Sequence, residues 1–140
     1  MTVTNKQSGT NVHEIADGIY RINTPVALPD GSALNFNQYL IADDEPLLFH
    51  NGPRRMFPLV SEAVAKVLPP GKLSYVALSH FEADECGSLN DFLAVAQRAV
   101  PVCSRVAAMV SVDDVADRPA RPLADGEILK LGRHELRWHD

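Results

Sequence analysis

The chain has little of what marks several classes of protein. Only 2 of its 140 residues are cysteines and 6% are aromatic, and it has neither a leader of basic and apolar residues nor an apolar run near the ~20 residues that cross a bilayer. Its net charge of -5 comes without a basic run, which excludes nucleic acid and anionic membrane surfaces as expected partners. These absences favour a cytoplasmic protein whose partner is a small molecule.

The two cysteines, Cys86 and Cys103, lack the paired spacing of a cysteine metal site, so we expect reduced thiols. With 46% hydrophobic and 22% charged residues, the chain is suited to one packed domain. Residues 1–11 are polar and are expected to form a flexible tail, and residues 12–140 are expected to form the domain. No internal repeat or low-complexity tract interrupts it.

The hydrophobic pattern changes along the chain from alternation to mixed strand and helix spacing. Turn residues such as Asp17-Gly18 separate the alternating stretches, which is typical of hairpins. The predicted elements are hairpins over 12–22 and 36–50, a helix over 56–68, a buried strand over 73–78, a helix over 89–100, a strand at 102–103, a short helix from Ser104 to Met109, a loop over 113–122 and a hairpin over 128–138. This order predicts an α/β (α+β) fold.

One segment carries most of the chemistry, because the run over 73–78 leads into a turn with four metal-ligand side chains. These are His80, Glu82, Asp84 and Glu85. In an extended chain residues 80 and 84 would lie roughly 13 Å apart at ~3.3 Å per residue, and in a helix residues two apart diverge. A curled loop remains, in which the first three converge on one metal ion or on two ions about 3.5–4 Å apart.

The alternative is a polar connection between a strand and a helix. Asp84 or Ser88 would then cap the next helix, and the acids would favour its N-terminus. Capping accounts for an Asp and a Ser but not for His80 and Glu82, so the metal interpretation is favoured. The order of strand, loop and helix also places the loop at the carboxyl end of a strand, where open α/β sheets bind ligands.

The stretches 36–41, 45–52 and 78–89 together resemble the metallo-β-lactamase superfamily. They are most similar to its flavodiiron and oxygen-binding di-iron branch, which carries His-x-Glu-x-Asp-His where zinc hydrolases carry His-x-His-x-Asp-His. Glu82 is the residue that discriminates. The resemblance implies a metallo-β-lactamase-like αββα sandwich, of which residues 12–140 supply about one half to two-thirds.

The resemblance implies that His80 and Glu82 bind a first metal ion and that Asp84 binds a second. Glu85 stands where the family has a histidine for the second ion. A carboxylate there either ligates and favours iron or manganese, or turns outward and leaves that ion weakly held.

Two further features flank the ligand loop. The family's Asp-Thr-Gly at the end of the earlier strand is here His50-Asn51-Gly52, so His50 and Asn51 are expected to support the loop only in part. Cys86 follows the loop directly and either tunes the site or is a small buried thiol. The other histidines, His13, His134 and His139, are expected to be structural.

In the family a further His, a bridging carboxylate and a final His follow this region, whereas the sequence stops at Asp140. We therefore expect a fragment or a half-domain, with the site completed by other residues or by a partner chain. Apolar sheet surface left uncovered would favour a homodimer.

Three functions follow from the sequence and the resemblance. The first is a di-iron oxidoreductase or oxygen-binding protein with an external redox partner, since no flavin-binding segment is visible. The second is a metal-dependent zinc hydrolase, and the third is a degenerate, non-catalytic binding or assembly module. The implied cofactors are two metal ions, with iron favoured over zinc or manganese.

Overall fold

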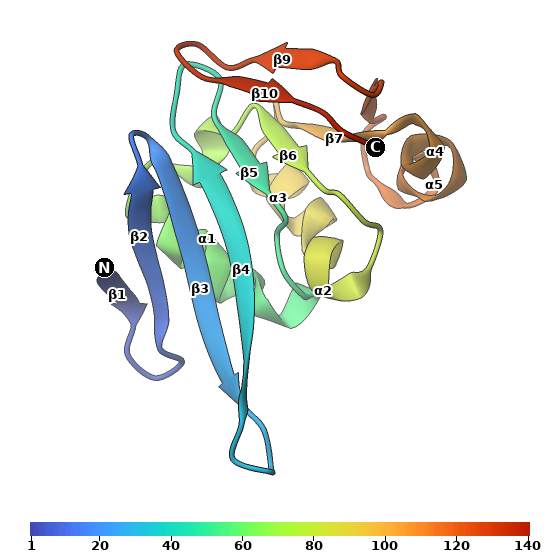
Figure 1. Ribbon diagram of the computed structural model, residues 1–140. Coiled ribbons are helices and arrows are strands. Elements are labelled where there is room, and N and C mark those ends of the chain that lie inside the picture. Colours follow the sequence, from blue (N-terminus) through green and yellow to red (C-terminus); the bar gives the residue numbers. More distant parts are fainter.

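The structure is a computed structural model that describes all 140 residues. One sheet of eight strands runs in sequential order from β1 to β8, and β9 and β10 form a separate hairpin (Figure 1). The strands are β1 (Thr2–Asn5), β2 (Thr10–Ala16), β3 (Ile19–Ala27), β4 (Ala33–Ile41), β5 (Leu47–Phe49), β6 (Tyr75–Ala77), β7 (Val100–Ser104), β8 (Arg121–Leu123), β9 (Ile128–Lys130) and β10 (Glu135–Arg137).

Helices occupy the connections of the second half of the chain. They are the 3-10 turns η1 (Arg54–Met56) and η2 (Pro70–Lys72), the α-helices α1 (Phe57–Ala65), α2 (Ala83–Cys86), α3 (Leu89–Val95), α4 (Arg105–Ala107) and α5 (Asp113–Val115), and the π-helical turn η3 (Ala108–Val112). The predicted cap at Ser104 is confirmed, because its side chain accepts a hydrogen bond from the Ala107 amide. None of the helices is long and apolar enough to cross a membrane.

The first half of the sheet is antiparallel, as the hairpin patterns predicted. Val12 pairs with Ile22 in the first hairpin, and Leu40 pairs with Leu48 in the second. Gly18 in the first turn has a φ of +75°, and a Cβ there would lie only 3.1 Å from the Ala42 carbonyl oxygen. A glycine is therefore required at this turn.

The second half of the sheet is parallel, from β5 through β6 and β7 to β8. The crossovers carry α1 and α3, which lie on one face of the sheet (Figure 1). Alternate residues of these strands, such as Leu48 and Val76, join Val60 of α1 and Phe92 of α3 in one apolar cluster of 20 buried residues. The strands and helices predicted between residues 56 and 103 are confirmed, although α3 ends at Val95 and not near residue 100. The loop predicted over 113–122 is wrong in part, since it contains α5 and the start of β8.

The opposite face of the parallel strands is covered by the β9–β10 hairpin. Leu47, Ala77 and Val102 form a second apolar cluster with Leu129 and Trp138 of the hairpin region. The chain thus builds a helix layer, a large sheet and a second, two-stranded sheet. These are successive layers of an αββα sandwich, in agreement with the predicted fold class.

The polar N-terminal residues form sheet instead of the predicted flexible tail. β1 pairs with β2 in antiparallel fashion, with Val3 opposite Asn11. Thr10 is fully buried, and its hydroxyl oxygen lies 2.9 Å from that of Thr24 on β3. Hydrogen bonding, not apolar burial, holds this edge, and for that reason hydrophobic alternation did not reveal it.

Arg118 caps the end of α3 from a distant part of the chain. Its guanidinium donates hydrogen bonds to the carbonyl oxygens of Leu93, Ala96 and Ala99, at the end of the helix and in the turn that follows. Carbonyls in the last turn of a helix have no partner within the helix, so these contacts fix the path from α3 into β7.

Replacing Arg118 with Met should lower the free energy of unfolding by about 1.5–3 kcal/mol, because hydrogen bonds to a charged donor are lost from partly buried carbonyls. Urea unfolding followed by circular dichroism measures the change. Arg98→Met is the matched control, since Arg98 is exposed and its loss should cost less than about 0.5 kcal/mol. Equal stabilities of the two variants would refute the capping role.

Asp43 joins the β4–β5 turn to the β9–β10 turn. Its carboxylate accepts hydrogen bonds from the amides of Arg133 and His134, and from the His134 Nδ1 at 2.7 Å. The His134 Nε2 lies 2.7 Å from the carbonyl oxygen of Asp17. Both ring nitrogens therefore face acceptors, an arrangement that favours the imidazolium.

The stability of this junction between the two turns depends on the protonation of His134. The hydrogen bond to Asp43, aided by the Asp17 carbonyl, raises the pKa of His134. Desolvation opposes ionisation of Asp43, but hydrogen bonds from His134, Asp44 and Arg133 outweigh it and lower the pKa of that carboxyl. The contribution of His134 is thus complete below its unfolded pKa of about 6.5 and is lost as pH rises through the raised folded value.

The gap in unfolding free energy between the wild type and His134→Gln should therefore be larger at about pH 6 than at about pH 9. Urea titrations at the two pH values measure it. His13→Gln, at an exposed strand position, is the control and should show no such dependence. A gap that widens with pH would contradict the assignment of a charged His134.

Candidate functional site

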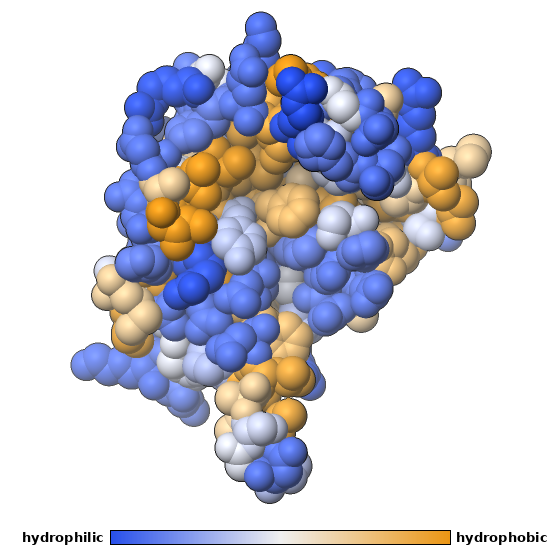
Figure 2. Space-filling model, viewed as in Figure 1, coloured by the Kyte–Doolittle hydropathy of each residue, from blue (hydrophilic) through white to orange (hydrophobic).

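The candidate site lies where three parallel strands end at one edge of the sheet. β5 is followed by His50, β6 by the loop with Ser79 and His80, and β7 ends at Ser104. A cavity of about 470 Å³ opens here between the loop and the C-terminal residues, and its lining includes His80, Ser104 and His139. The neighbouring face of the sheet appears as a hollow with an apolar floor beneath the hairpin (Figure 2).

The loop after β6 presents three of the predicted ligands to solvent. His80, Glu82 and Asp84 are all exposed, and Glu82 has extended backbone at φ -128° just before α2. Nowhere in the chain do three His, Cys, Asp or Glu side chains gather as a metal-ion site. The imidazole and carboxylate donors have the chemistry that iron accepts, but their arrangement in this chain alone does not complete a metal centre.

Glu85 turns inward, and not outward as one of the two expectations for this residue had it. Its Oε2 lies 3.4 Å from the Nε2 of His50, and its side chain is only 22% exposed. Its main-chain carbonyl accepts a hydrogen bond from the Asn51 amide at 2.7 Å. The side chain and the carbonyl of Glu85 thus contact the segment that follows β5, while its amide donates to the Glu82 carbonyl oxygen at 3.0 Å within the turn.

His50 receives the inward contacts of the loop. Its Nε2 lies 2.8 Å from the Ser79 Oγ, and the Ser79 amide donates to the same nitrogen at 3.3 Å. The ring stacks on Phe49 with centroids 4.3 Å apart. His50 has a φ of +62°, which is strained for a residue other than glycine. Burial lowers the pKa of His50 although Glu85 acts in the opposite direction.

Asn51 fixes the far end of the loop. The residue is fully buried, and its Oδ1 accepts a hydrogen bond from the Ser88 amide at 2.9 Å. The Ser88 hydroxyl donates to the Pro53 carbonyl at 2.9 Å. Ser88 stands at the N-cap of α3, but neither it nor Asp84 makes a side-chain capping hydrogen bond, so that part of the capping alternative is wrong. Its other part is confirmed, because Asp84 and Glu85 lie in the first turn of α2.

Cys86 lies inside the fold directly behind the ligand loop. Its Sγ donates to the Glu82 carbonyl oxygen at 3.3 Å, and burial raises its pKa. Cys103 is likewise free and buried, and burial raises its pKa to about 11. These environments hold both thiols protonated at neutral pH, which is typical of inert buried cysteines.

Two contributors to this edge of the sheet were missed in the sequence. Ser79 looked like a plain loop residue, and only the packing of β5 beside β6 reveals its contact with His50. Arg105 lines the cavity beside His80 because β7 pairs with β6. No local sequence signal marks either residue, since each depends on which strands become neighbours.

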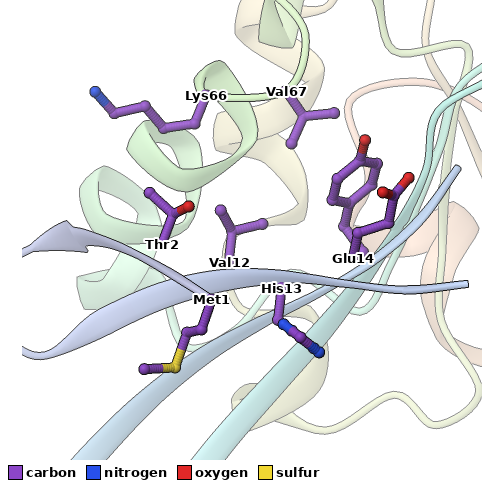
Figure 3. Close-up of a pocket in the computed structure, with 8 residues that line it drawn as sticks. Met1, Thr2, Val12, His13, Glu14, Lys66 and Val67 are labelled. Atoms are coloured by element: carbon purple, nitrogen blue, oxygen red, sulfur yellow. The ribbon is translucent and has the colours of Figure 1, made fainter.

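Another cavity, of about 550 Å³, lies away from this edge. Residues of β1, β2 and the end of α1 line it, and the charged ends of Lys66 and Glu14 point to opposite sides (Figure 3). The strands β3, β4 and β5 separate β2 from β6, which is roughly 19 Å at about 4.8 Å per strand spacing. This cavity is therefore separate from the ligand loop.

Known proteins share this fold and part of this sequence. Rubredoxin-oxygen oxidoreductase of Megalodesulfovibrio gigas is 26% identical over 107 residues, which are 75% of this chain and 27% of that protein. Among solved structures, rubredoxin oxygen:oxidoreductase from Desulfovibrio gigas aligns with a TM-score of 0.80 at 23% identity, over 93% of this chain and 35% of that one. The flavodiiron protein from Giardia intestinalis aligns with a TM-score of 0.74 at 22% identity, over 91% and 33%.

The chain thus spans about a quarter to a third of the length of these proteins. The structural likeness confirms the fold that the sequence motifs implied. A family model described as ODP family beta lactamase matches residues 34–138, which is more than half of the chain. On this match, the chain belongs to the ODP family of beta-lactamase-fold proteins.

Proposed function

We propose that this chain supplies the ligand-loop half of a di-iron oxidoreductase domain that acts on oxygen. The observation that carries the proposal is the exposed loop with His80, Glu82 and Asp84 at the carboxyl edge of the parallel strands, in a chain of this family. The name of the M. gigas relative, an oxygen oxidoreductase, supports the choice of substrate.

The donor set favours iron. One imidazole nitrogen and two carboxylates make a hard, oxygen-rich set, whereas structural zinc sites are mainly built from Cys and His. The loop offers too few donors for two ions, so the remaining ligands come from residues beyond this chain or from a partner chain. When bound, iron would supply one-electron chemistry toward oxygen, and the chain's own residues would bind and orient it.

The electrons would come from another protein, and the assembly would include a second copy of the chain. We propose an external redox partner, a cytoplasmic location and a homodimer. Support for a partner comes from the hollow beside the hairpin, where a cavity of about 240 Å³ is lined by the apolar side chains of Phe49, Leu136 and Trp138 (Figure 2). Apolar surface of this kind is usually covered in a finished assembly.

A non-catalytic binding module is the second candidate. The observation in its favour is that no three donor side chains of the chain converge. A zinc hydrolase would rest on the same loop, and no contact in the structure favours it over iron chemistry. Metal content separates these functions directly.

Protein prepared without oxygen and loaded with Fe(II) should hold close to one iron per chain by elemental analysis. His80→Ala should weaken iron binding by at least about 10-fold, since a metal-ligand nitrogen is lost. Because His80 is exposed, its free energy of unfolding should change by less than about 0.5 kcal/mol.

His13→Ala is the matched control, as His13 is an exposed histidine on β2 far from the loop. Its iron content should equal that of the wild type. Iron unaffected by His80→Ala would remove the ligand assignment. Preference for zinc over iron would transfer the proposal to hydrolysis, and no metal at all would leave the non-catalytic module.

A further inference from the structure

His50 contacts both ends of the ligand loop. Ser79 lies just before His80, and Glu85 lies just after Asp84. The Nε2 of His50 is 2.8 Å from the Ser79 Oγ and 3.4 Å from the Glu85 Oε2. One ring nitrogen at the end of β5 therefore bridges the two residues between which all the exposed donors lie.

The backbone holds Glu85 in the same inward position. The Asn51 amide donates to its carbonyl oxygen at 2.7 Å, and the Gly52 amide approaches the same oxygen at 3.4 Å. Asn51 also accepts the Ser88 amide, three residues beyond Glu85. These contacts fix the main chain of Glu85 beside the segment that follows β5, and so fix the point from which its side chain extends toward His50.

Charge favours the same arrangement. Glu82, Asp84 and Glu85 place three carboxylates within four residues. Carboxylates that share one site repel each other. The Glu85 Oε2 is buried and has no hydrogen-bond partner, and the group recorded beside it is the His50 Nε2 at 3.4 Å.

Ser79, His50 and Glu85 do not form a nucleophilic triad. In such a triad the acid holds one ring nitrogen and the serine approaches the other. Here both groups lie at Nε2, so Glu85 cannot orient the ring for proton transfer from Ser79. The three residues instead hold the two ends of the ligand loop together.

We propose that Glu85 is a positioning residue and not a metal ligand. Its contact with His50, called the bracket below, holds the end of the loop and leaves His80, Glu82 and Asp84 as the metal donors. The inference rests on the proposed function for the identity of the donors. Its consequence is that the loop itself holds one ion, and that the second-metal position implied by the family has only Asp84 from this chain.

The bracket is tested first in the metal-free chain. Long-range ¹⁵N correlation spectra at one pH report the His50 ring nitrogens directly. Glu85→Ala should move the His50 Nε2 signal, whereas Glu82→Ala, which removes an exposed carboxylate of the same loop, should leave it in place. An unmoved signal in Glu85→Ala, or an equal shift in both variants, would overturn the bracket.

A conservative substitution then separates positioning from ligation. Glu85→Gln keeps a side-chain oxygen for the bracket, so Fe(II) affinity should stay within about 3-fold of wild type, while Glu85→Ala and Glu82→Gln should each lose about 10-fold or more. Loss in Glu85→Gln equal to that in Glu82→Gln would make Glu85 a ligand and overturn the proposal.

The ¹⁵N spectra and the Fe(II) affinities together separate a failure of this inference from a failure of the proposed function. If wild type binds no iron, the proposed function fails, and the His50 signal alone supports or overturns the bracket. If Glu85→Ala does not fold by its amide spectrum, His50→Gln probes the same contact from the other side. The Ser79 and Glu85 amide signals should then move, and unmoved signals would overturn the bracket.

Discussion

The parallel pairing of β5 with β6 and of β6 with β7 is the constraint on which the candidate site depends. Parallel strands in register end at the same edge, so His50, Ser79 and Ser104 meet there although more than 50 residues separate the first from the last. Apolar clusters on both faces hold these strands, the helices on one side and the hairpin on the other. A shift by one residue would exchange the two faces and separate the contacts of His50.

The ligand loop divides into groups that are held and groups that are free. Hydrogen bonds to His50 and Asn51 fix the Ser79 hydroxyl, the Glu85 carbonyl and the Ser88 amide. The side chains of His80, Glu82 and Asp84, in contrast, are exposed to solvent. Contacts outside the ligand set commonly orient the ligands of a metal site. Here such contacts fix both ends of the loop and so position its donors, although they supply no further ligand. A complete metal site would need further donor side chains, which this chain does not place beside these three.

Most of the fold could be predicted from the sequence, because its main elements carry local signals. The alternation around Asp17-Gly18 and the helical spacing over 56–68 each correspond to an element of the structure. The strand at residues 2–5 was hidden because its stability comes from pairing with β2 and not from apolar burial. At the site, residue types identified the donors, but the inward turn of Glu85 depends on contacts between β5 and the loop, which no local pattern encodes.

The most direct measurement is a crystal structure of the chain loaded with Fe(II) under anaerobic conditions, with anomalous diffraction recorded at the iron edge. We expect one anomalous peak per chain, bonded to His80 and Glu82, with the Glu85 carboxylate still against His50. Two peaks per chain, or a single peak bonded to Glu85, would contradict this assignment of the ligands.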